Sequence, residues 1–442
     1  MLKKLNISKD LQNTTINQFW RLISGPIILL LIPLYLSGEI QGFWFTFISL
    51  GALSVFADLG FTNIVLQFSA HEFAYLKFNN NGLLSGENEN LKKIGSLFKF
   101  AFFWGIKISI IVFPLILMVG FFVLSRKQDE NIIWVVPWII YGLSTVVTFL
   151  NNIVLSFVEG CNLVAKIQKI RFFIIFAYSL FIIIFLILKL NLYALSISLL
   201  LSSLLGTFLI LKSYHSLILQ LLSLSSNSNY AWNKKIFPLL KKYSLSWISG
   251  YFIFSILTPI AFYFYGPIEA GKIGLSISIW TSITSISYIW ISSVYPKINI
   301  LIEKQDITSL NQVFYKHFIF AIFTFLTLSI LFFVVYFFVQ NNLQELADRL
   351  VGVGSLFILC ICWLIQVFIH YLAIYIRSHK VELLVAPSVF SAIYISLSTS
   401  IISFFLNEYY FFIGFFTSYL FVFPWIIYIF IKFKRTKYAI LQ

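Results

Sequence analysis

Long apolar stretches separated by short polar segments run through most of this 442-residue chain. A helix needs about 20 apolar residues to cross the hydrocarbon core of a bilayer. The pattern therefore predicts an all-α polytopic membrane protein with about twelve transmembrane helices. We place them at residues 14–36, 42–69, 96–124, 132–157, 171–188, 192–213, 243–265, 272–296, 315–339, 350–376, 382–405 and 410–431.

The composition excludes several function classes. Hydrophobic residues make up 60% of the chain and charged residues only 11%, whereas a soluble domain is about half apolar and a quarter charged. A soluble enzyme, a nucleic-acid binder and a disordered scaffold are thereby excluded. Cys360 and Cys362 are two residues apart in a predicted helix and point to different faces, so we expect no metal site and no disulfide between them.

The basic residues predict the orientation of the chain in the membrane. The chain has 31 Lys and Arg residues and a net charge of +15. Of these basic residues, 24 fall on one side of the predicted spans and 5 on the other. The positive-inside rule then places both termini in the cytoplasm. The outer loops are too short for a catalytic domain, and we find no phosphate-binding glycine loop. We therefore predict no catalytic residues and an ion gradient as the source of energy.

The spans divide into two sets of six. Residues 214–242 form the predicted cytoplasmic linker between an N-terminal lobe, 1–213, and a C-terminal lobe, 243–442, that ends in a basic cytoplasmic tail. Each lobe opens with a span, a glycine-bounded turn carrying one Glu (38–42 and 266–271), and a second span. Two six-span halves of the same orientation predict pseudo-symmetric repeats related by an axis along the membrane normal.

Three charged residues lie well inside predicted spans of the first lobe, where a charge costs roughly 2.5 to 3.5 kcal/mol on insertion scales. Arg21 is about 8 Å inside the first span; it either snorkels to the headgroups or binds an anion. Asp58, at a similar depth in the second span, either pairs with Arg21 or carries a coupling proton. Lys107 is deeper in the third span, and we expect it to line an aqueous cavity.

Four uncharged or weakly basic residues complete the candidate set. Asn151 and Asn152 either bind substrate or form interhelical hydrogen bonds. Trp280 lies in a hydroxyl-rich span and either stacks on a sugar or packs between helices. His370 either carries a coupling proton or is a hydrogen-bonded packing residue.

The chain resembles the O-antigen flippases, polysaccharide-transport members of the multidrug, oligosaccharidyl-lipid and polysaccharide exporter superfamily. The resemblance rests on Arg21 with Gly25-Pro26, on the turn Gly38-Glu39-Ile40-Gln41-Gly42-Phe43-Trp44, and on Asp58-Leu59-Gly60-Phe61 followed by His71-Glu72. It covers essentially the whole chain, mostly in layout. The second lobe departs from the more cationic members of the family, because His370 is its one obvious ionisable residue at depth.

The resemblance implies two six-helix lobes that form a V-shaped central cavity. It further implies translocation of undecaprenyl-pyrophosphate-linked O-antigen repeat units from the inner to the outer leaflet of the bacterial inner membrane, coupled to protons or sodium and without a bound cofactor. Membrane lipids, an O-antigen polymerase and a chain-length regulator are the other implied partners, and no nucleic acid is among them. A membrane-embedded polymerase or glycosyltransferase and a multidrug exporter of the same superfamily stay open as alternatives.

Overall fold

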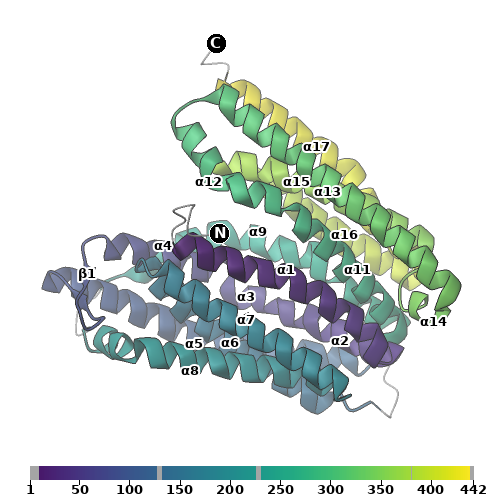
Figure 1. Cartoon of the computed structure of the whole chain (residues 1–442), viewed down its shortest axis with the longest axis horizontal. Helices are drawn as coiled ribbons and strands as arrows, with labels where there is room; N and C mark the ends of the chain where they lie inside the picture. The colour runs from purple at the N-terminus through teal and green to yellow at the C-terminus, as the bar shows by residue number, and fades with distance from the viewer. Residues whose placement is uncertain (1–8, 127–131, 225–229, 380, 439–442) are drawn as a thin grey trace, which may run out of the picture. The chain divides into compact units, whose positions relative to one another are not determined.

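The computed structural model describes residues 9–126, 132–224, 230–379 and 381–438, which are almost entirely helical (Figure 1). The helices and strands are α1 (Lys9–Tyr35), α2 (Gly38–Gly51), η2 (Ala52–Ser54), α3 (Val55–Asp58), α4 (Phe61–Phe73), β1 (Lys77–Phe78), β2 (Leu84–Ser85), α5 (Asn88–Leu124), α6 (Val135–Gly160), α7 (Val164–Ile187), α8 (Leu192–Ser223), α9 (Trp232–Gly250), η3 (Tyr251–Ser255), α10 (Leu257–Tyr265), α11 (Pro267–Ser287), α12 (Ile289–Glu303), α13 (Ile307–Asn342), α14 (Gln344–Ala347), α15 (Val353–Ser378), α16 (Val385–Phe405), η4 (Glu408–Tyr410) and α17 (Ile413–Tyr438).

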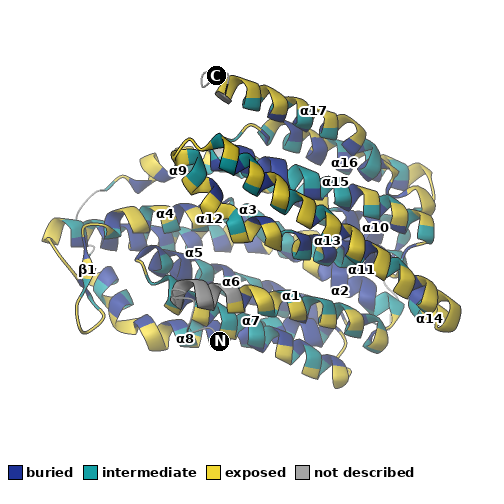
Figure 2. Ribbon diagram, turned by 45° about the horizontal axis from the view of Figure 1, so that its top comes forward, coloured by how far each residue is buried: buried dark blue, intermediate teal, exposed yellow. Residues whose placement is uncertain are grey.

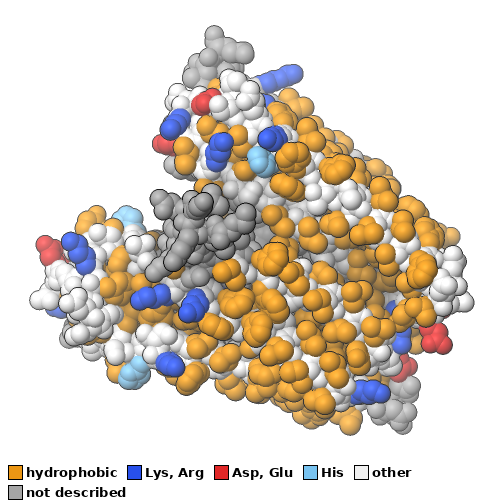
Figure 3. Space-filling model, in the orientation of Figure 1, with side chains coloured by type: hydrophobic (Ala, Val, Ile, Leu, Met, Phe, Trp, Pro, Cys, Tyr) orange, Lys and Arg blue, Asp and Glu red, His pale blue; other side chains and the backbone are white. Residues whose placement is uncertain are grey.

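The predicted fold class is confirmed. Ten helical segments among the described residues are long and apolar enough to cross a membrane, and two bent pairs bring the number to twelve if each pair is one span. Most helices have one buried and one exposed face (Figure 2). Hydrophobic side chains cover much of the surface (Figure 3), as expected where a helix faces lipid instead of water. Ile, Leu and Phe are the commonest of the large exposed side chains.

The chain forms two compact units. The first consists of Met1–Leu31 and Phe47–Ile248, and the second of Ile32–Thr46 and Ser249–Gln442. In the first unit α6 packs on α4, α5 and α8, and α7 packs on α8; in the second α11 packs on α10, α13 and α15, and α17 packs on α15 and α16. The end of α8 and the start of α9 together cover most of the predicted linker, and α9 belongs almost wholly to the first unit. Residues 225–229 of that linker lie outside the described residues.

The two glycine-bounded turns that the sequence showed as repeats meet inside the second unit. A Cβ on Gly42 would overlap the backbone carbonyl of Pro267, and one on Gly271 would lie 2.9 Å from the Gly42 nitrogen. The buried amide of Gln41 also donates to the carbonyl oxygen of Gly271 at 2.9 Å. Glycine at both positions therefore lets the first turns of α2 and α11 pack backbone to backbone.

The prediction of one continuous second span, 42–69, is wrong. The helical path through α2, η2 and α3 ends at Asp58, and α4 begins only at Phe61. Leu59 and Gly60 between them take the left-handed conformation, with φ of 47° and 83°. Gly60 adopts that conformation without steric penalty, and the Asp58 carboxylate accepts a hydrogen bond from the Thr62 backbone nitrogen at 3.0 Å, which caps the new helix.

Two predicted spans of the second half are bent. The span predicted at 243–265 bends by 42° between Ser255 and Leu257. Pro259 lies four residues after Ser255, so its ring removes one helical hydrogen bond there, and the preceding turn forms the π-helix η3. The span predicted at 272–296 bends by 41° at Tyr288, directly after a run of hydroxyl side chains that bond back to helix carbonyls.

Candidate functional site

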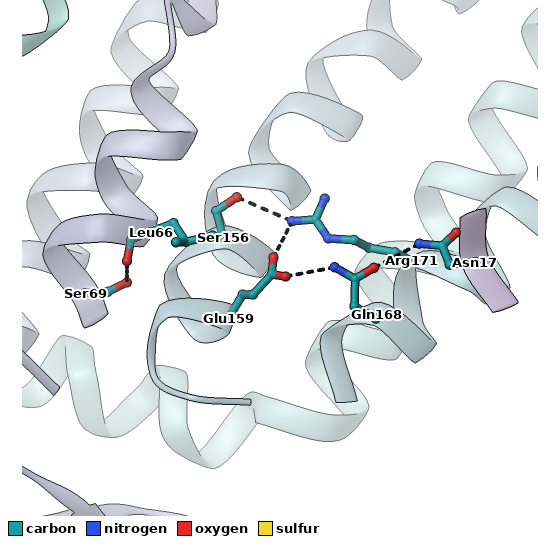
Figure 4. Close-up of polar contacts among 7 residues, drawn as sticks. All are labelled: Asn17, Leu66, Ser69, Ser156, Glu159, Gln168 and Arg171. Carbon is teal, nitrogen blue, oxygen red and sulfur yellow. Dashed lines mark hydrogen bonds and ion pairs between the residues drawn. The ribbon is translucent and has the colours of Figure 1, made fainter. Parts of the chain in front are cut away.

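A network of polar side chains joins three helices of the first unit (Figure 4). Helix α6 ends at Gly160 and α7 begins at Val164, so a short turn sets the end of one helix beside the start of the next. Helix α6 contributes Glu159, α7 contributes Gln168 and Arg171, and α1 contributes Asn17. The close turn explains why residues twelve positions apart face each other.

The network is continuous from α1 to α6. Arg171 Nη2 donates to Glu159 Oε2 at 3.1 Å. Gln168 Nε2 donates to the other carboxylate oxygen, Oε1, at 2.8 Å. Asn17 Nδ2 donates to Gln168 Oε1 at 3.0 Å, which completes the chain of contacts. Both oxygens of the Glu159 carboxylate are thus held by donors on α7.

Two atoms of this network keep unused hydrogen-bonding capacity. Glu159 has 13% of its side chain exposed and Arg171 has 27%, while Asn17 is 5% exposed overall. Within the described residues, the buried atoms Asn17 Oδ1 and Arg171 Nε have no hydrogen-bond partner. An unpartnered acceptor and an unpartnered donor beside an ion pair can hold one polar group of a ligand or a water molecule.

The end of α6 is also fixed from its other side. A Cβ on Gly160 would overlap the Ser69 hydroxyl and the Leu66 carbonyl oxygen, both on α4. The Ser69 hydroxyl donates to that same carbonyl at 3.0 Å, as Figure 4 shows. Glu159 is therefore carried on a helix end that is packed tightly on α4 and cannot easily shift.

The structure does not bring Arg21 and Asp58 together. Trp20 packs on α7 through a 3.0 Å hydrogen bond to Ser179, which turns its neighbour Arg21 to the exposed side of α1. The two oxygens of Asp58 accept hydrogen bonds from the backbone and side chain of Thr62. Within the described residues neither Arg21 nor Asp58 forms an ion pair, so the predicted structural pair is absent.

Lys107 is exposed near the middle of α5. Gly105 and Ser109, two residues to either side, are buried. Positions two apart on a helix point about 200° apart, so burial of these neighbours turns Lys107 outward. Among the described residues we find no ion pair or hydrogen bond to its ammonium group.

Asn151 and Asn152 have different environments. Asn151 is buried; its Nδ2 donates to the Ser203 carbonyl at 2.8 Å and its Oδ1 accepts from Thr207 at 3.0 Å, so its amide joins α6 to α8. Asn152 is half-buried and makes no polar contact in the part of the chain that the structure describes. The interhelical alternative therefore fits Asn151, while Asn152 is available to a ligand.

We expect Asn151→Ala to lower the thermal stability of the purified protein, because Thr207 and Ser203 lose a partner on the neighbouring helix. Interhelical hydrogen bonds in membrane proteins contribute about 0.6 kcal/mol on average and about 1.7 kcal/mol at most. Asn152→Ala, the same change one residue away, is the control and should leave the unfolding temperature in detergent unchanged. Equal unfolding temperatures for the two variants would contradict the assignment.

Trp280 lies in the core of the second unit. Its side chain is fully buried and its ring packs against Phe325, Phe332 and Phe333 of α13, at centroid distances of 6.1, 5.2 and 5.8 Å. A buried ring surrounded in this way has no open face for a sugar. The packing alternative describes Trp280 in this structure.

His370 stacks on Tyr288 at the bend between α11 and α12, with ring centroids 3.7 Å apart and planes inclined by 15°. The Tyr288 hydroxyl donates to the Gln366 carbonyl at 3.3 Å, and Gln366 Nε2 donates to the Tyr419 hydroxyl at 2.6 Å. His370 therefore sits beside a small polar cluster that connects three helices of the second unit, and its part in ion coupling stays a prediction.

Sequence analysis missed the Glu159–Arg171 network. Neither Glu159 nor Arg171 is among the candidate residues that the sequence predicts, and Arg171 contributes there only to the excess of basic residues on the cytoplasmic side. The sequence does contain one indication of the pair. The two residues carry opposite charges on neighbouring helices that are joined by a turn of only three residues, 161–163.

Comparison with known proteins identifies the fold. No protein-family model and no curated protein sequence matches the chain. A solved multidrug resistance MATE family transporter of the MOP superfamily, in an inward-facing conformation, is similar over 93% of this chain and 99% of its own, with a TM-score of 0.58 and 14% identity.

Two further solved structures agree. An outward-facing MATE family transporter covers 97% of this chain and 94% of its own, with a TM-score of 0.55 and 11% identity. A MOP superfamily transporter from Pyrococcus furiosus, described as having a binding pocket of reverse polarity that suggests a different function, covers 96% of this chain and 94% of its own, with a TM-score of 0.53 and 12% identity. This chain therefore has the fold of MATE transporters.

Proposed function

We propose that this chain is a membrane transporter that works by alternating access and is driven by a proton or sodium gradient. The observation that carries the proposal is the similarity in fold to solved transporters along nearly the whole length of both chains. Solved structures of this fold are described in inward-facing and in outward-facing conformations, which supports alternating access.

The exposed charged residues of the first unit support an anionic substrate. Arg21 and Lys107 are cations in spanning helices, are exposed and have no polar partner among the described residues. Asp58 accepts hydrogen bonds from Thr62, and Glu159 is neutralised by Arg171. With the resemblance in sequence, this balance supports a lipid-linked oligosaccharide whose pyrophosphate is held by Lys107 and Arg21, and which is moved across the bacterial inner membrane.

A multidrug exporter is the second candidate. The similar solved structures favour it, because several of them are described as multidrug or MATE transporters. Asp58 would then be the group that attracts a cationic drug, since a carboxylate that accepts two hydrogen bonds still has unused lone pairs. The two candidates differ in the sign of the substrate's charge.

Lys107→Gln and Asp58→Asn separate these candidates in cells that lack their own transporters. For an anionic lipid-linked substrate, Lys107→Gln should abolish most display of surface polysaccharide at equal membrane abundance, and Lys107→Arg should retain it. A charge-assisted hydrogen bond contributes about 1.5 to 3 kcal/mol, so binding should fall at least tenfold. For a cationic drug, Asp58→Asn should abolish efflux while Lys107→Gln leaves it intact.

Lys166→Gln, which removes an exposed lysine near the start of α7, is the control for the loss of a positive charge. Full surface display of polysaccharide with Lys107→Gln would contradict the proposal that Lys107 binds the anionic substrate. Absence of both polysaccharide display and drug efflux with the unaltered chain, at normal membrane abundance, would contradict both candidates.

A further inference from the structure

A second candidate binding site lies wholly within the second unit. A cavity of about 1090 Å³ opens among four helix ends: the C-terminal ends of α12, α15 and α17 and the N-terminal end of α13. The distribution of Lys and Arg along the sequence predicts that this end of the unit lies on the cytoplasmic side. The cavity shares no residue with the polar network of the first unit.

Positive charge predominates in the lining of the cavity. Lys437 and Arg377 line it together with His379, and Glu303 is the one acidic residue in the lining. Arg377 is held by Glu382, with Nε 3.0 Å from Oε2 and Nη2 2.9 Å from Oε1. Lys437 is exposed and has no ion pair or hydrogen bond within the described residues, so its ammonium group is available to a ligand.

The remaining lining is apolar on one side and polar on the other. Ile300 and Leu310 contribute aliphatic surface, and the Phe433 ring lies edge-on to His379 with centroids 5.2 Å apart. Asn299 adds an amide. Binding sites for small molecules usually occupy about 300 to 1,000 Å³ and combine apolar walls with a few polar groups. This cavity is large enough for a charged headgroup and part of an attached chain.

We propose that this cavity binds the phosphate group of an anionic amphiphile, with Lys437 as the principal cation and His379, when it is protonated, as a second positive charge. Lysine is a compact charge with three donors that suits a phosphate oxygen, and the apolar wall beside Phe433 accommodates the chain attached to the phosphate. Two sources share this chemistry: the headgroup of an acidic membrane lipid and a soluble phosphorylated compound. The proposal concerns binding and is independent of the transported substrate.

His379 gives the site a dependence on pH. Burial and the nearby Lys437 lower the pKa of His379, while the hydrogen bond between its Nδ1 and the Tyr375 carbonyl opposes that shift. The charged groups in the lining are Glu303 of α12, Arg377 of α15 and Lys437 of α17, and α13 contributes none. A bound phosphate offsets the charge of Lys437 and so raises the pKa of His379. Binding of the phosphate and protonation of His379 favour each other. Because the phosphate group itself loses a negative charge at about pH 6, the contribution of His379 is measured as the ratio of the affinities of the unaltered chain and His379→Gln, and this ratio should rise as the pH falls.

The test is a calorimetric titration of the full chain in a non-ionic detergent. The probes are dioctanoyl phosphatidic acid, dioctanoyl phosphatidylcholine and inorganic phosphate. We expect phosphatidic acid to bind and phosphatidylcholine, whose headgroup has no net charge, to bind at least tenfold more weakly. Lys437→Gln should raise the Kd of phosphatidic acid about tenfold, and Lys437→Arg should restore most of the affinity. The affinity of the unaltered chain relative to that of His379→Gln should rise as the pH falls.

Lys432→Gln is the matched control, because Lys432 is exposed on the same helix, α17, and does not line the cavity. Stronger binding of phosphatidic acid than of inorganic phosphate identifies a lipid as the source, and the reverse identifies a soluble phosphate compound. Equal affinities for phosphatidic acid and phosphatidylcholine, or equal effects of Lys437→Gln and Lys432→Gln, would overturn the proposal. A circular dichroism spectrum identical to that of the unaltered chain excludes misfolding of a variant.

Discussion

Gly42→Ala is expected to reduce the amount of folded protein sharply and to lower its unfolding temperature. The new Cβ would overlap the backbone carbonyl of Pro267, and a backbone atom cannot rotate out of the way as a side chain does. Helices α2 and α11 would have to separate, which would also lengthen the hydrogen bond from Gln41 to Gly271. Overpacking of a well-packed core costs about 1 to 3 kcal/mol, and a clash with backbone belongs at the upper end of that range.

Gly354→Ala is the matched control for this prediction. Gly354 also lies in the first turn of a spanning helix of the second unit, α15, and an added Cβ would meet no atom within 4 Å. Alanine in a helix is favoured over glycine by roughly 1 kcal/mol, so this variant should be as stable as the unaltered chain or more stable. Fluorescence-detected size-exclusion chromatography after heating measures both variants. If Gly42→Ala survives heating as well as Gly354→Ala does, the close packing of the two turns is wrong.

Hydropathy predicted the fold well because every helix that crosses a membrane needs about 20 predominantly apolar residues. The bends and the break were harder to predict. Pro259 is visible in the sequence, and a bend one turn before it follows from the clash of its ring. The break after Asp58 depends on Leu59 as well as Gly60 taking the left-handed conformation, and a leucine gives no sign of that. The hydroxyl groups before Tyr288 are equally compatible with a straight helix.

The candidate site was harder to predict because hydropathy gives the depth of a residue and not its direction around the helix axis. Trp280 and Lys107 were both placed inside the membrane, yet the first is fully buried against α13 and the second is exposed on α5. Asn151 and Asn152 are adjacent and have different environments for the same reason. Glu159 and Arg171 cannot be recognised as a pair from the sequence, because charges near the ends of spans are normally explained by the orientation of the chain in the membrane.

Arg171→Gln is expected to destabilise the first unit more than any other substitution of a polar residue considered above. It leaves the carboxylate of Glu159, with 13% of its side chain exposed, without a positive partner. Removal of one member of a buried ion pair costs about 3 to 5 kcal/mol, and partial exposure of Arg171 places this pair toward the lower end. Glu159→Gln should be similarly harmful, because it leaves the guanidinium group uncompensated. The double variant removes both charges, keeps amides that can bond to each other, and should recover part of the stability.

The pair Glu269–Lys272, which lies within one helix and has a more exposed carboxylate than Glu159, provides the comparison for this double-mutant cycle. Its side chains are 24% and 29% exposed and lie three residues apart on α11. Such pairs contribute about 0.2 to 1 kcal/mol, so Glu269→Gln, Lys272→Gln and their combination should change the unfolding temperature little and additively. In contrast, the Glu159 and Arg171 variants should be strongly non-additive, because each single change leaves an uncompensated charge that the double change removes. Additive effects at Glu159 and Arg171 would mean that the two side chains do not depend on each other. The network would then consist of separate hydrogen bonds and not of one ion pair supported by Gln168 and Asn17.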